Sequence, residues 1–426
     1  MVSISAESAT ARWPSIAGVA LVAATVLFNA FLAIVNAHVH AIGYGAVAVV
    51  QAMLTGCAAL VVVAARPKGI GPWLAYLWLA MCGFLFLALL RGRAEPRYLA
   101  DILTILVFVM LGLALRRRDL LVGLVALQAV VCVVALWELA SAQSFAAVFM
   151  VKDFYVNTRG FLDDAVWSGP ENLFISSERP GGRLFGAALD LHRASSVFLE
   201  PVSLGNWTVI VTLAIAALRP ARRVFIFLIA TNLFLLFACD GRLALAVNLI
   251  LLATWPILPR LPIWVPPLFL PLMLVGLVIA ASFDLLGPVD DTLGGRFAYS
   301  INYLGSLGTR DLLGFYDKGG IVAADSGWAY LILTQSIFGL LGIWLALTVT
   351  GRTSPEARHM IGGVALFIAT CLPITYSLFS IKTAGMLWAV YGVAIARRNL
   401  AKSASSKNGK FVAVTETQLC SYPELT

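Results

Sequence analysis

The fold is decided by one stretch, which runs RFAYSINYLGSLGTRDLLG (296–314) and resumes as DSGWAYLILTQSIFGLLGIWLAL (325–347). Its first part is charged and broken by glycines, and its last part is an apolar run. Irregular backbone cannot lie in lipid hydrocarbon, because its N–H and C=O groups would be unpaired. The charged part must therefore lie at a membrane surface or line a wet cavity. It carries Arg296, Arg310 and Asp325, and we interpret it as half of an active site.

The whole chain has the composition of a membrane protein. Hydrophobic residues make up 60% of it and charged residues only 12%, whereas a soluble domain has about 25% charged residues. Apolar runs recur from end to end, and about 18 residues suffice to cross a bilayer core of ~30 Å. We therefore predict an all-α fold, a polytopic bundle of about 12 transmembrane helices.

The predicted segments follow the ends of the apolar runs. They are a cytoplasmic N-terminus (1–15), five transmembrane helices (16–140), a large extracytoplasmic loop (141–202), transmembrane helices six to nine (203–282), a second extracytoplasmic loop (283–326), the C-terminal transmembrane helices (327–396) and a cytoplasmic tail (397–426). The last two spans, 359–380 and 382–396, are joined by a very short connection. The tail is rich in Ser and Lys, a composition typical of disorder.

Basic residues indicate the orientation. Lys and Arg recur at alternate span ends, at 66–68, 116–118, 219–223, 352–358 and 397–410. The positive-inside rule makes that side cytoplasmic, so both long loops face outward. Topology thus explains the net charge of +8, and we expect no nucleic-acid partner. The six Cys and four His residues form no metal-binding spacing, and we expect neither metal nor cofactor.

The outward side nevertheless carries many basic residues, which are mostly arginines. The arginines include Arg91, Arg93 and Arg97, and the lysines on this side are Lys152, Lys318 and Lys382. The planar guanidinium matches phosphate oxygens in a bidentate fashion. An anionic ligand arriving at the outer face is therefore one interpretation. The alternative is that each arginine reaches a lipid headgroup or pairs with a nearby acid.

Loop 141–202 supplies the first candidate site residues. They are Arg183, Arg193 and Glu200, and Glu200 stands where the chain re-enters the membrane. A carboxylate there is costly unless it is hydrogen-bonded or functional. Glu200 is a candidate for catalysis, or else it forms a salt bridge with Arg193 or Arg183 that fixes the loop.

Two further outward segments supply the other candidates. Asp240 and Arg242 lie in a short turn, and Arg242 begins the next helix, where an arginine and a helix N-terminus together can bind an anion. The same turn could be purely structural. Asp325 immediately precedes a predicted span, so it is either a functional carboxylate or a cap of that helix.

The order of these elements resembles the bacterial O-antigen ligase/polymerase superfamily, and it is most similar to the Wzy-type polysaccharide polymerases. The similarity covers roughly residues 180–350. The matching elements are Arg193-x-x-Ser196-x-Phe198-x-Glu200-Pro201, Asp240-Gly241-Arg242, Gly295-Arg296, Leu313-Gly314, 325–331 and 338–342.

The resemblance implies a metal-independent glycosyltransferase of GT-C-like architecture in the bacterial inner membrane, with its active site facing the periplasm. The donor would be an oligosaccharide on undecaprenyl diphosphate, and the product an O-antigen or exopolysaccharide. Membrane lipid is an expected partner, as are a chain-length regulator and a flippase of the same pathway. Asp325 stands where the ligase branch carries a His-Asn pair, and Gly241 replaces a family Ser. The first departure favours a polymerase.

The implied reaction assigns roles to the candidates. The leaving diphosphate needs fixed cations, for which Arg193, Arg242 and Arg296 are predicted. The acceptor hydroxyl needs a general base, predicted to be Glu200 or Asp325. The secondary candidates are Arg183, Asp240 and Arg310. The aromatic residues that could stack on sugars, or lie in an interfacial belt, are Trp167, Phe198, Trp207, Tyr299, Tyr303 and Trp328.

Two other functions fit the same sequence. A ligase that moves glycan onto lipid A core or protein would use the same donor. A transporter, in particular a lipid-linked oligosaccharide flippase, agrees with the number of spans. However, the sequence has no internal repeat, and its charges concentrate in the outer loops rather than at span centres.

Replacing either matched arginine should stop chain extension. Arg242→Ala and Arg296→Ala each remove a cation that the leaving diphosphate needs. We expect single repeat units in place of long chains when surface glycan is separated on gels, with normal levels of the protein. Chains of wild-type length in either variant would remove that residue from the site.

Overall fold

The computed structural model describes residues 13–164, 167–178, 191–290, 292–315, 326–351 and 354–408. The part described is all-helical, with 78% helix and no strand. Nine of its helices are long and apolar enough to cross a membrane. The predicted polytopic helical membrane fold is therefore confirmed. The expected number of about 12 spans stays a prediction, because the shorter apolar helices are not among these nine.

The long apolar helices are α2 (Trp13–His38), α3 (Tyr44–Ala65), α4 (Gly71–Arg91), α5 (Pro96–Ala114), α6 (Arg117–Ala140), α10 (Pro201–Leu218), α11 (Arg222–Cys239), α13 (Val265–Ser282) and α16 (Gly327–Val349). The shorter helices of the bundle are α12 (Arg242–Thr254), α17 (Pro355–Cys371) and α18 (Ile381–Asn408). The remaining elements are α7 (Ala142–Phe149), α8 (Val151–Arg159), η1 (Ser196–Phe198), η2 (Leu258–Arg260), α14 (Leu293–Gly305), α15 (Thr309–Leu312) and η3 (Ser377–Phe379).

Two bounds differ from those expected. The predicted span 359–380 stops at Cys371, because Pro373, two residues further on, has no N–H to donate to a carbonyl of the preceding turn. Residues 372–380 therefore form a non-helical connection with only one short 3₁₀ turn, η3. The second difference concerns the last span, which was expected to end at 396. Its helix, α18, continues to Asn408, into the segment expected to be disordered.

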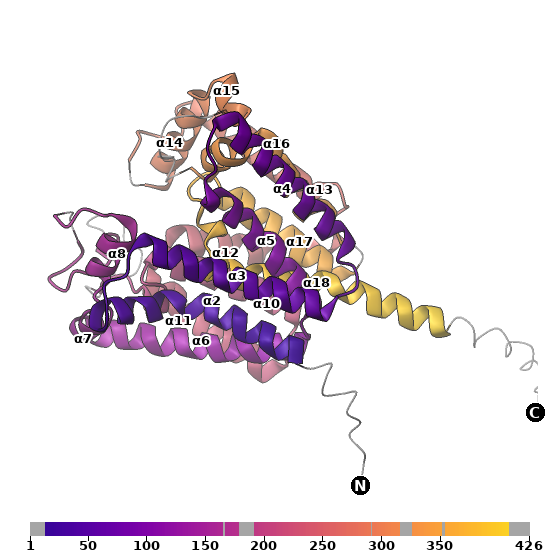
Figure 1. Ribbon diagram of the computed structural model, residues 1–426, viewed down its shortest axis with the longest axis horizontal. Coiled ribbons are helices and arrows are strands. Elements are labelled where there is room, and N and C mark those ends of the chain that lie inside the picture. Colours follow the sequence, from indigo (N-terminus) through magenta and orange to yellow (C-terminus); the bar gives the residue numbers. More distant parts are fainter. Residues whose placement is uncertain are drawn as a thin grey trace, which may run out of the picture.

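The helix ends sort into two opposite ends of the bundle (Figure 1). At one end, which we call the basic end, Arg117 of α6 donates hydrogen bonds to the carbonyls of Leu218 and Arg219, and Arg219 pairs with Glu356 at 2.9 Å. These contacts cap α10, whose last carbonyls have no partner within the helix. The opposite end, the loop end, carries α7, α8, α14 and α15. The positive-inside rule predicts that the loop end faces outward.

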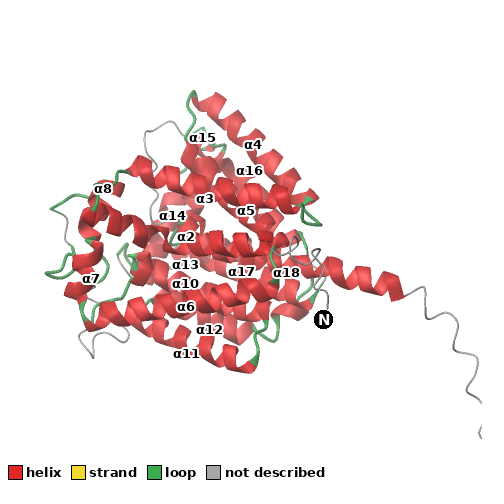
Figure 2. Cartoon of the chain, turned by 60° about the horizontal axis from the view of Figure 1, so that its bottom comes forward, coloured by secondary structure: helices red, strands yellow, loops and turns green. Residues whose placement is uncertain are grey.

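Close contact between α5 and α18 holds the centre together (Figure 2). A Cβ atom on Gly112 would lie 2.3 Å from the Ala389 carbonyl oxygen, and one on Gly392 would lie 2.2 Å from that of Val109. Both glycines therefore let two backbones touch, as small residues do where membrane helices cross closely. This contact fixes the last turns of α5 against residues 389–392 of α18.

A break divides α16 into two halves. Ser336 has φ 66° and ψ 168°, outside the helical region. Arg91 donates to the freed carbonyls of Leu333 (2.9 Å) and Thr334 (3.1 Å), and also to that of Gly314 (2.6 Å). Non-helical backbone is tolerated in a membrane protein when other groups pair with it. Arg91 thereby fixes the first half of α16.

Filling the α5–α18 contact should destabilise the protein. Gly112→Ala places a methyl group against backbone that cannot rotate away, and overpacking of this kind costs about 1–3 kcal/mol. The matched control is Gly56→Ala in α3, where nothing lies within 4 Å of the new Cβ. Thermal unfolding in detergent should show a lower midpoint for Gly112→Ala only. Equal midpoints for the two variants would contradict the close contact.

Candidate functional site

A cluster of buried opposite charges lies at the loop end, where α10 begins. The Glu200 carboxylate contacts Arg159 Nη2 of α8 and Lys382 Nζ of α18, each at 2.5 Å, and accepts a hydrogen bond from Ser203 Oγ at 2.8 Å. The side chain of Lys382 is 2% exposed and that of Glu200 11%, whereas that of Arg159 is 42% exposed. Three helices distant in sequence thus meet at one carboxylate, and one of its cations is open to solvent.

The loop before α10 is held in place by a second buried carboxylate. Glu138, near the end of α6, accepts hydrogen bonds from the backbone N–H groups of Ser195 (2.9 Å) and Ser196 (2.6 Å) and from Ser195 Oγ (2.9 Å). Such bonds satisfy a carboxylate that is otherwise costly to bury. Lys382 Nζ also donates to the carbonyl of Phe198 at 3.3 Å. The backbone leading to Glu200 is therefore fixed from two sides.

The charges around Glu200 keep it ionised. Burial raises the pKa of Glu200, but Arg159 and Lys382 outweigh that effect and hold it at about 2. Burial and the Glu200 charge raise the pKa of Tyr155 well above its usual range, so this phenol is neutral. The Arg159 guanidinium lies 4.6 Å from the centre of the Tyr155 ring. Glu200 is therefore a weak proton acceptor, and its contacts position Arg159 and Lys382.

A second polar group adjoins the first. Arg97 of α5 donates to the Tyr376 hydroxyl at 3.2 Å, and its guanidinium lies 5.7 Å from the Tyr376 ring and 5.9 Å from the Tyr330 ring. The two rings are stacked, 4.4 Å apart. Tyr330 in turn donates to Asp101 Oδ2 at 2.5 Å. The first turns of α5 and α16 are joined here through residues 372–380.

Tyr376 connects the two groups. Its phenol is near enough to Arg159 to interact electrostatically with that guanidinium, and it is hydrogen-bonded to Arg97. We call the combined set the cation cluster: Arg97, Arg159, Lys382, Glu200, Asp101 and Tyr376. It holds three cations against two carboxylates, and both guanidiniums are at least partly exposed. Partly exposed arginines with an excess of positive charge can bind an anion.

The structure brings two predicted site segments together. Arg193, which is 5% exposed, donates to the carbonyls of Cys239 (2.9 Å) and Ser176 (3.0 Å). It therefore lies against the turn that contains Asp240, and Arg242 begins α12 directly after that turn. Asp240 is buried and has φ 43°, a left-handed conformation that Asp tolerates better than most residues.

The other predicted site residues lie elsewhere. Arg296 is in α14, which packs against α13 and α16, and Arg310 is in the exposed α15. Figures 1 and 2 both show α14 apart from α12. The three predicted diphosphate-binding arginines thus occupy two places rather than one pocket. Asp325 and Arg183 lie outside the described residues, and the roles of all these residues stay predictions.

Burial separates the aromatic candidates into two groups. Phe198, Trp207, Trp328 and Trp167 are buried in the protein, so their faces are not open to a sugar. Only Tyr299 and Tyr303 of α14 are half-exposed, with ring centres 5.9 Å apart. Stacking on sugars therefore stays a prediction for these two tyrosines alone.

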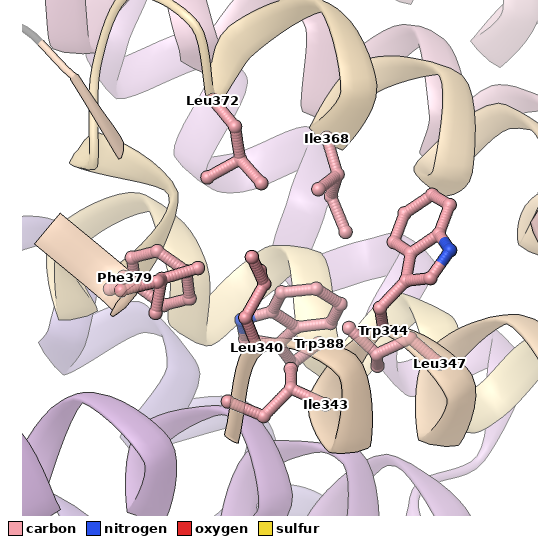
Figure 3. Close-up of a pocket in the computed structure, with 9 residues that line it drawn as sticks. Leu340, Ile343, Trp344, Leu347, Ile368, Leu372, Phe379 and Trp388 are labelled. Carbon is pink, nitrogen blue, oxygen red and sulfur yellow. The ribbon is translucent and has the colours of Figure 1, made fainter. Parts of the chain in front are cut away.

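A small apolar cavity lies between α16, α17 and α18, beside the connection that carries Tyr376 (Figure 3). Its volume is about 20 Å³ and its lining is entirely apolar, formed by residues such as Leu340, Trp344 and Trp388. A cavity of this size holds about one water molecule, and an apolar one stays dry. It is a packing defect rather than a ligand site.

Several members of the cation cluster were not predicted as site residues. Lys382 stands in the first turn and Asp101 in the second turn of an apolar helix, and a charged residue there signals a partner or a function. That signal could have singled them out, but it does not say which partner each one has. Arg159 and Tyr376 carry no signal in the sequence. In the part of the chain that the structure describes, no three His, Cys, Asp or Glu side chains gather as a metal site.

Comparisons with known proteins do not assign the chain to a family. No family model matches it, and neither curated proteins nor solved structures give a match. We therefore infer a function from the residues and geometry of the chain itself.

Glu200 should make stability depend on pH. Its pKa is about 2 in the folded state and about 4.3 in an unfolded chain. Its stabilising contribution is therefore fully present above the unfolded value and is lost as the pH falls from there toward 2. Glu200→Gln should be less stable at pH 7, by about 3–5 kcal/mol for a broken buried pair. It should also lose less stability than the wild type between pH 5 and pH 3.

Thermal unfolding in detergent at several pH values measures this difference. Asp164→Asn, at an exposed loop position, is the matched control and should follow the wild-type curve. Parallel pH curves for Glu200→Gln and the wild type would show that Glu200 is not held ionised by its neighbours.

Proposed function

We propose that the protein is a polymerase that joins oligosaccharide repeat units carried on undecaprenyl diphosphate. The reaction would take place at the outer leaflet of the bacterial inner membrane and yield a surface polysaccharide. The single observation that supports this proposal best is the cation cluster. In it, Arg97 is hydrogen-bonded to Tyr376, Arg159 interacts electrostatically with the same phenol, and Arg159 and the buried Lys382 share the Glu200 carboxylate. It is found at the loop end, where a lipid headgroup would meet the protein.

The chemistry of the reaction calls for such a cluster. The acceptor hydroxyl oxygen forms a bond to the donor anomeric carbon while the bond from that carbon to the diphosphate oxygen breaks. The electron pair leaves with the diphosphate, and the hydroxyl proton goes to a base. Cations that are already fixed stabilise the developing negative charge without reorganising. No nucleotide is needed, because the diphosphate linkage already stores the energy.

Arg159 is suited to this role by its surroundings. Its pairing with Glu200 and its contact with Tyr155 fix the guanidinium, which still has 42% of its side chain exposed. A guanidinium has five N–H donors, and one carboxylate oxygen does not use them all. The remaining donors can bind phosphate oxygens, so Glu200 orients Arg159 rather than neutralising the site.

α14 offers a place for the acceptor glycan. Arg296, Tyr299 and Tyr303 lie three and four residues apart and so share one face of the helix. Tyr303 packs against the small cluster of Ala329, Tyr330 and Leu333, and Tyr330 is stacked on Tyr376 of the cation cluster. This arrangement favours a role for Arg296 on the acceptor side rather than at the diphosphate. The glycan would run along α14 toward the reacting carbon.

The position of the charges argues against a transporter. Transport pathways are marked by charged residues near the bilayer midplane. Among the described residues of the long spans, Asp101, Glu138 and Arg91 lie near helix ends. A ligase would use the same donor chemistry and differ in its acceptor, so analysis of the lipid-linked products separates ligase from polymerase.

Deleting the gene and analysing the lipid-linked glycans tests the proposal. Loss of a polymerase leaves single repeat units on the carrier or core at the outer face. Loss of a ligase leaves polymer on the carrier, and loss of a flippase leaves single units facing the cytoplasm. The first pattern is expected, and either of the others would replace the proposed function.

Variants of the exposed arginines should fail to restore polymer in that strain. Arg97→Gln and Arg159→Gln each remove a fixed cation, and losing one such donor typically lowers turnover about 10²–10³-fold. The matched control is Arg223→Gln, an exposed arginine at the basic end, which should support full-length chains. Normal chain lengths with both loop-end variants would separate the cation cluster from the reaction.

A further inference from the structure

The reaction needs a proton acceptor close to the diphosphate-binding cations. Two carboxylates of the described residues belong to the cation cluster, Glu200 and Asp101. Glu200 is in contact with Arg159 through one oxygen and with Lys382 through the other. A carboxylate held between two cations gives up their stabilisation when it takes a proton, so Glu200 is poorly suited to act as a base.

Asp101 has the opposite arrangement. It lies in the second turn of α5 and is partly exposed. Its Oδ2 accepts the hydrogen bond from the Tyr330 hydroxyl at 2.5 Å. Among the described residues, no hydrogen bond is donated to its Oδ1. One oxygen therefore anchors the carboxylate, and the other is left to accept a proton.

The anchor of Asp101 is rigid. Tyr330 is only 3% exposed, and its ring is stacked on Tyr376 with an angle of 19° between the planes. It belongs to the first half of α16, which Arg91 fixes through the carbonyls of Leu333 and Thr334. A buried, stacked phenol has little rotational freedom. Tyr330 therefore holds the Asp101 carboxylate in one orientation.

Arg97 places Asp101 beside the site of the leaving group. It precedes Asp101 by one helical turn on the same face of α5. The two residues interact electrostatically, but within the described chain no ion pair joins them. The same guanidinium is hydrogen-bonded to Tyr376 and exposed to solvent. A diphosphate bound at Arg97 would thus lie within one helical turn of a carboxylate whose Oδ1 accepts no hydrogen bond from the residues that the structure describes.

We propose that Asp101 is the general base of the reaction, an inference that rests on the proposed polymerase function. Asp101 Oδ1 takes the proton of the acceptor hydroxyl as that oxygen bonds to the anomeric carbon. The bond from the anomeric carbon to the diphosphate breaks, and its electron pair leaves with the diphosphate. The protonated Asp101 then returns its proton to water. Tyr330 is a positioning residue that orients the carboxylate and does not contact the substrate.

Steady-state kinetics of the purified full-length protein in lipid nanodiscs, with a lipid-linked repeat unit as donor, tests this role. Asp101→Asn keeps the shape of the side chain, and kcat should fall about 10²–10⁴-fold, the usual contribution of a general base. The KM for the donor and the thermal midpoint should stay close to those of the wild type. Added formate should restore part of the activity of Asp101→Ala, because a small carboxylate can occupy the vacated position.

Tyr330→Phe separates positioning from a structural role. This variant keeps the Asp101 carboxylate but removes its anchor, so kcat should fall less than in Asp101→Asn while the donor KM is unchanged. If Asp101→Asn does not fold, an unchanged kcat in Tyr330→Phe overturns the inference, and a lowered kcat with unchanged KM supports it.

Other outcomes are equally decisive. An Asp101→Asn variant with wild-type kcat would overturn the role of Asp101 as general base but not the proposed polymerase function. The same holds if the loss of activity matches a loss of folded protein or of donor binding, since Asp101 would then only tie α5 to α16. A wild-type protein that forms no polymer from any lipid-linked donor would overturn the proposed function together with this inference.

Discussion

The ion pairing of Glu200 with Arg159 and Lys382 is the constraint on which the loop end depends. Removing the Glu200 carboxylate and the Lys382 ammonium from water is costly, and attraction between opposite charges offsets that cost only when the geometry is good. Here each oxygen of Glu200 lies 2.5 Å from a cation, and Ser203 adds a hydrogen bond. The arrangement ties α8, α10 and α18 together at one point. It also leaves Arg159 partly exposed, so the contact that stabilises the fold presents a guanidinium to the outside.

Three other features of the fold hold residues of the cation cluster, or their neighbours, in place. Gly112 and Gly392 let α5 and α18 approach closely, and Arg97 and Lys382 stand in the first turns of these two helices. Arg91 pairs with the freed carbonyls of the broken α16 and so fixes the half of that helix that carries Tyr330. The non-helical connection 372–380 carries Tyr376, which is hydrogen-bonded to Arg97 and interacts electrostatically with Arg159. Stability and the proposed chemistry therefore depend on the same contacts.

The sequence predicts the fold class because the length and polarity of a membrane span are local properties, visible within about 20 residues. It also contains the signal that ends α17, since Pro373 interrupts the expected span. It could not predict the cation cluster, because Lys382 and Glu200 are 182 positions apart and nothing local selects one as the partner of the other. The break at Ser336 lies inside an apolar run and is stabilised by a distant arginine. The sequence grouped Arg193 with the Asp240 turn as parts of one site, and the structure brings them together. The sequence could not predict that Arg296 lies apart from them, because that depends on how α14 packs.

The central claim is that a lipid diphosphate binds between Arg97 and Arg159. Electron cryomicroscopy of the protein in lipid nanodiscs with added polyprenyl diphosphate tests it most directly. The account predicts density for two phosphate groups beside the guanidiniums of Arg97 and Arg159, next to Tyr376. Density for the diphosphate at Arg242 or Arg296 instead, with the cation cluster unoccupied, would contradict it.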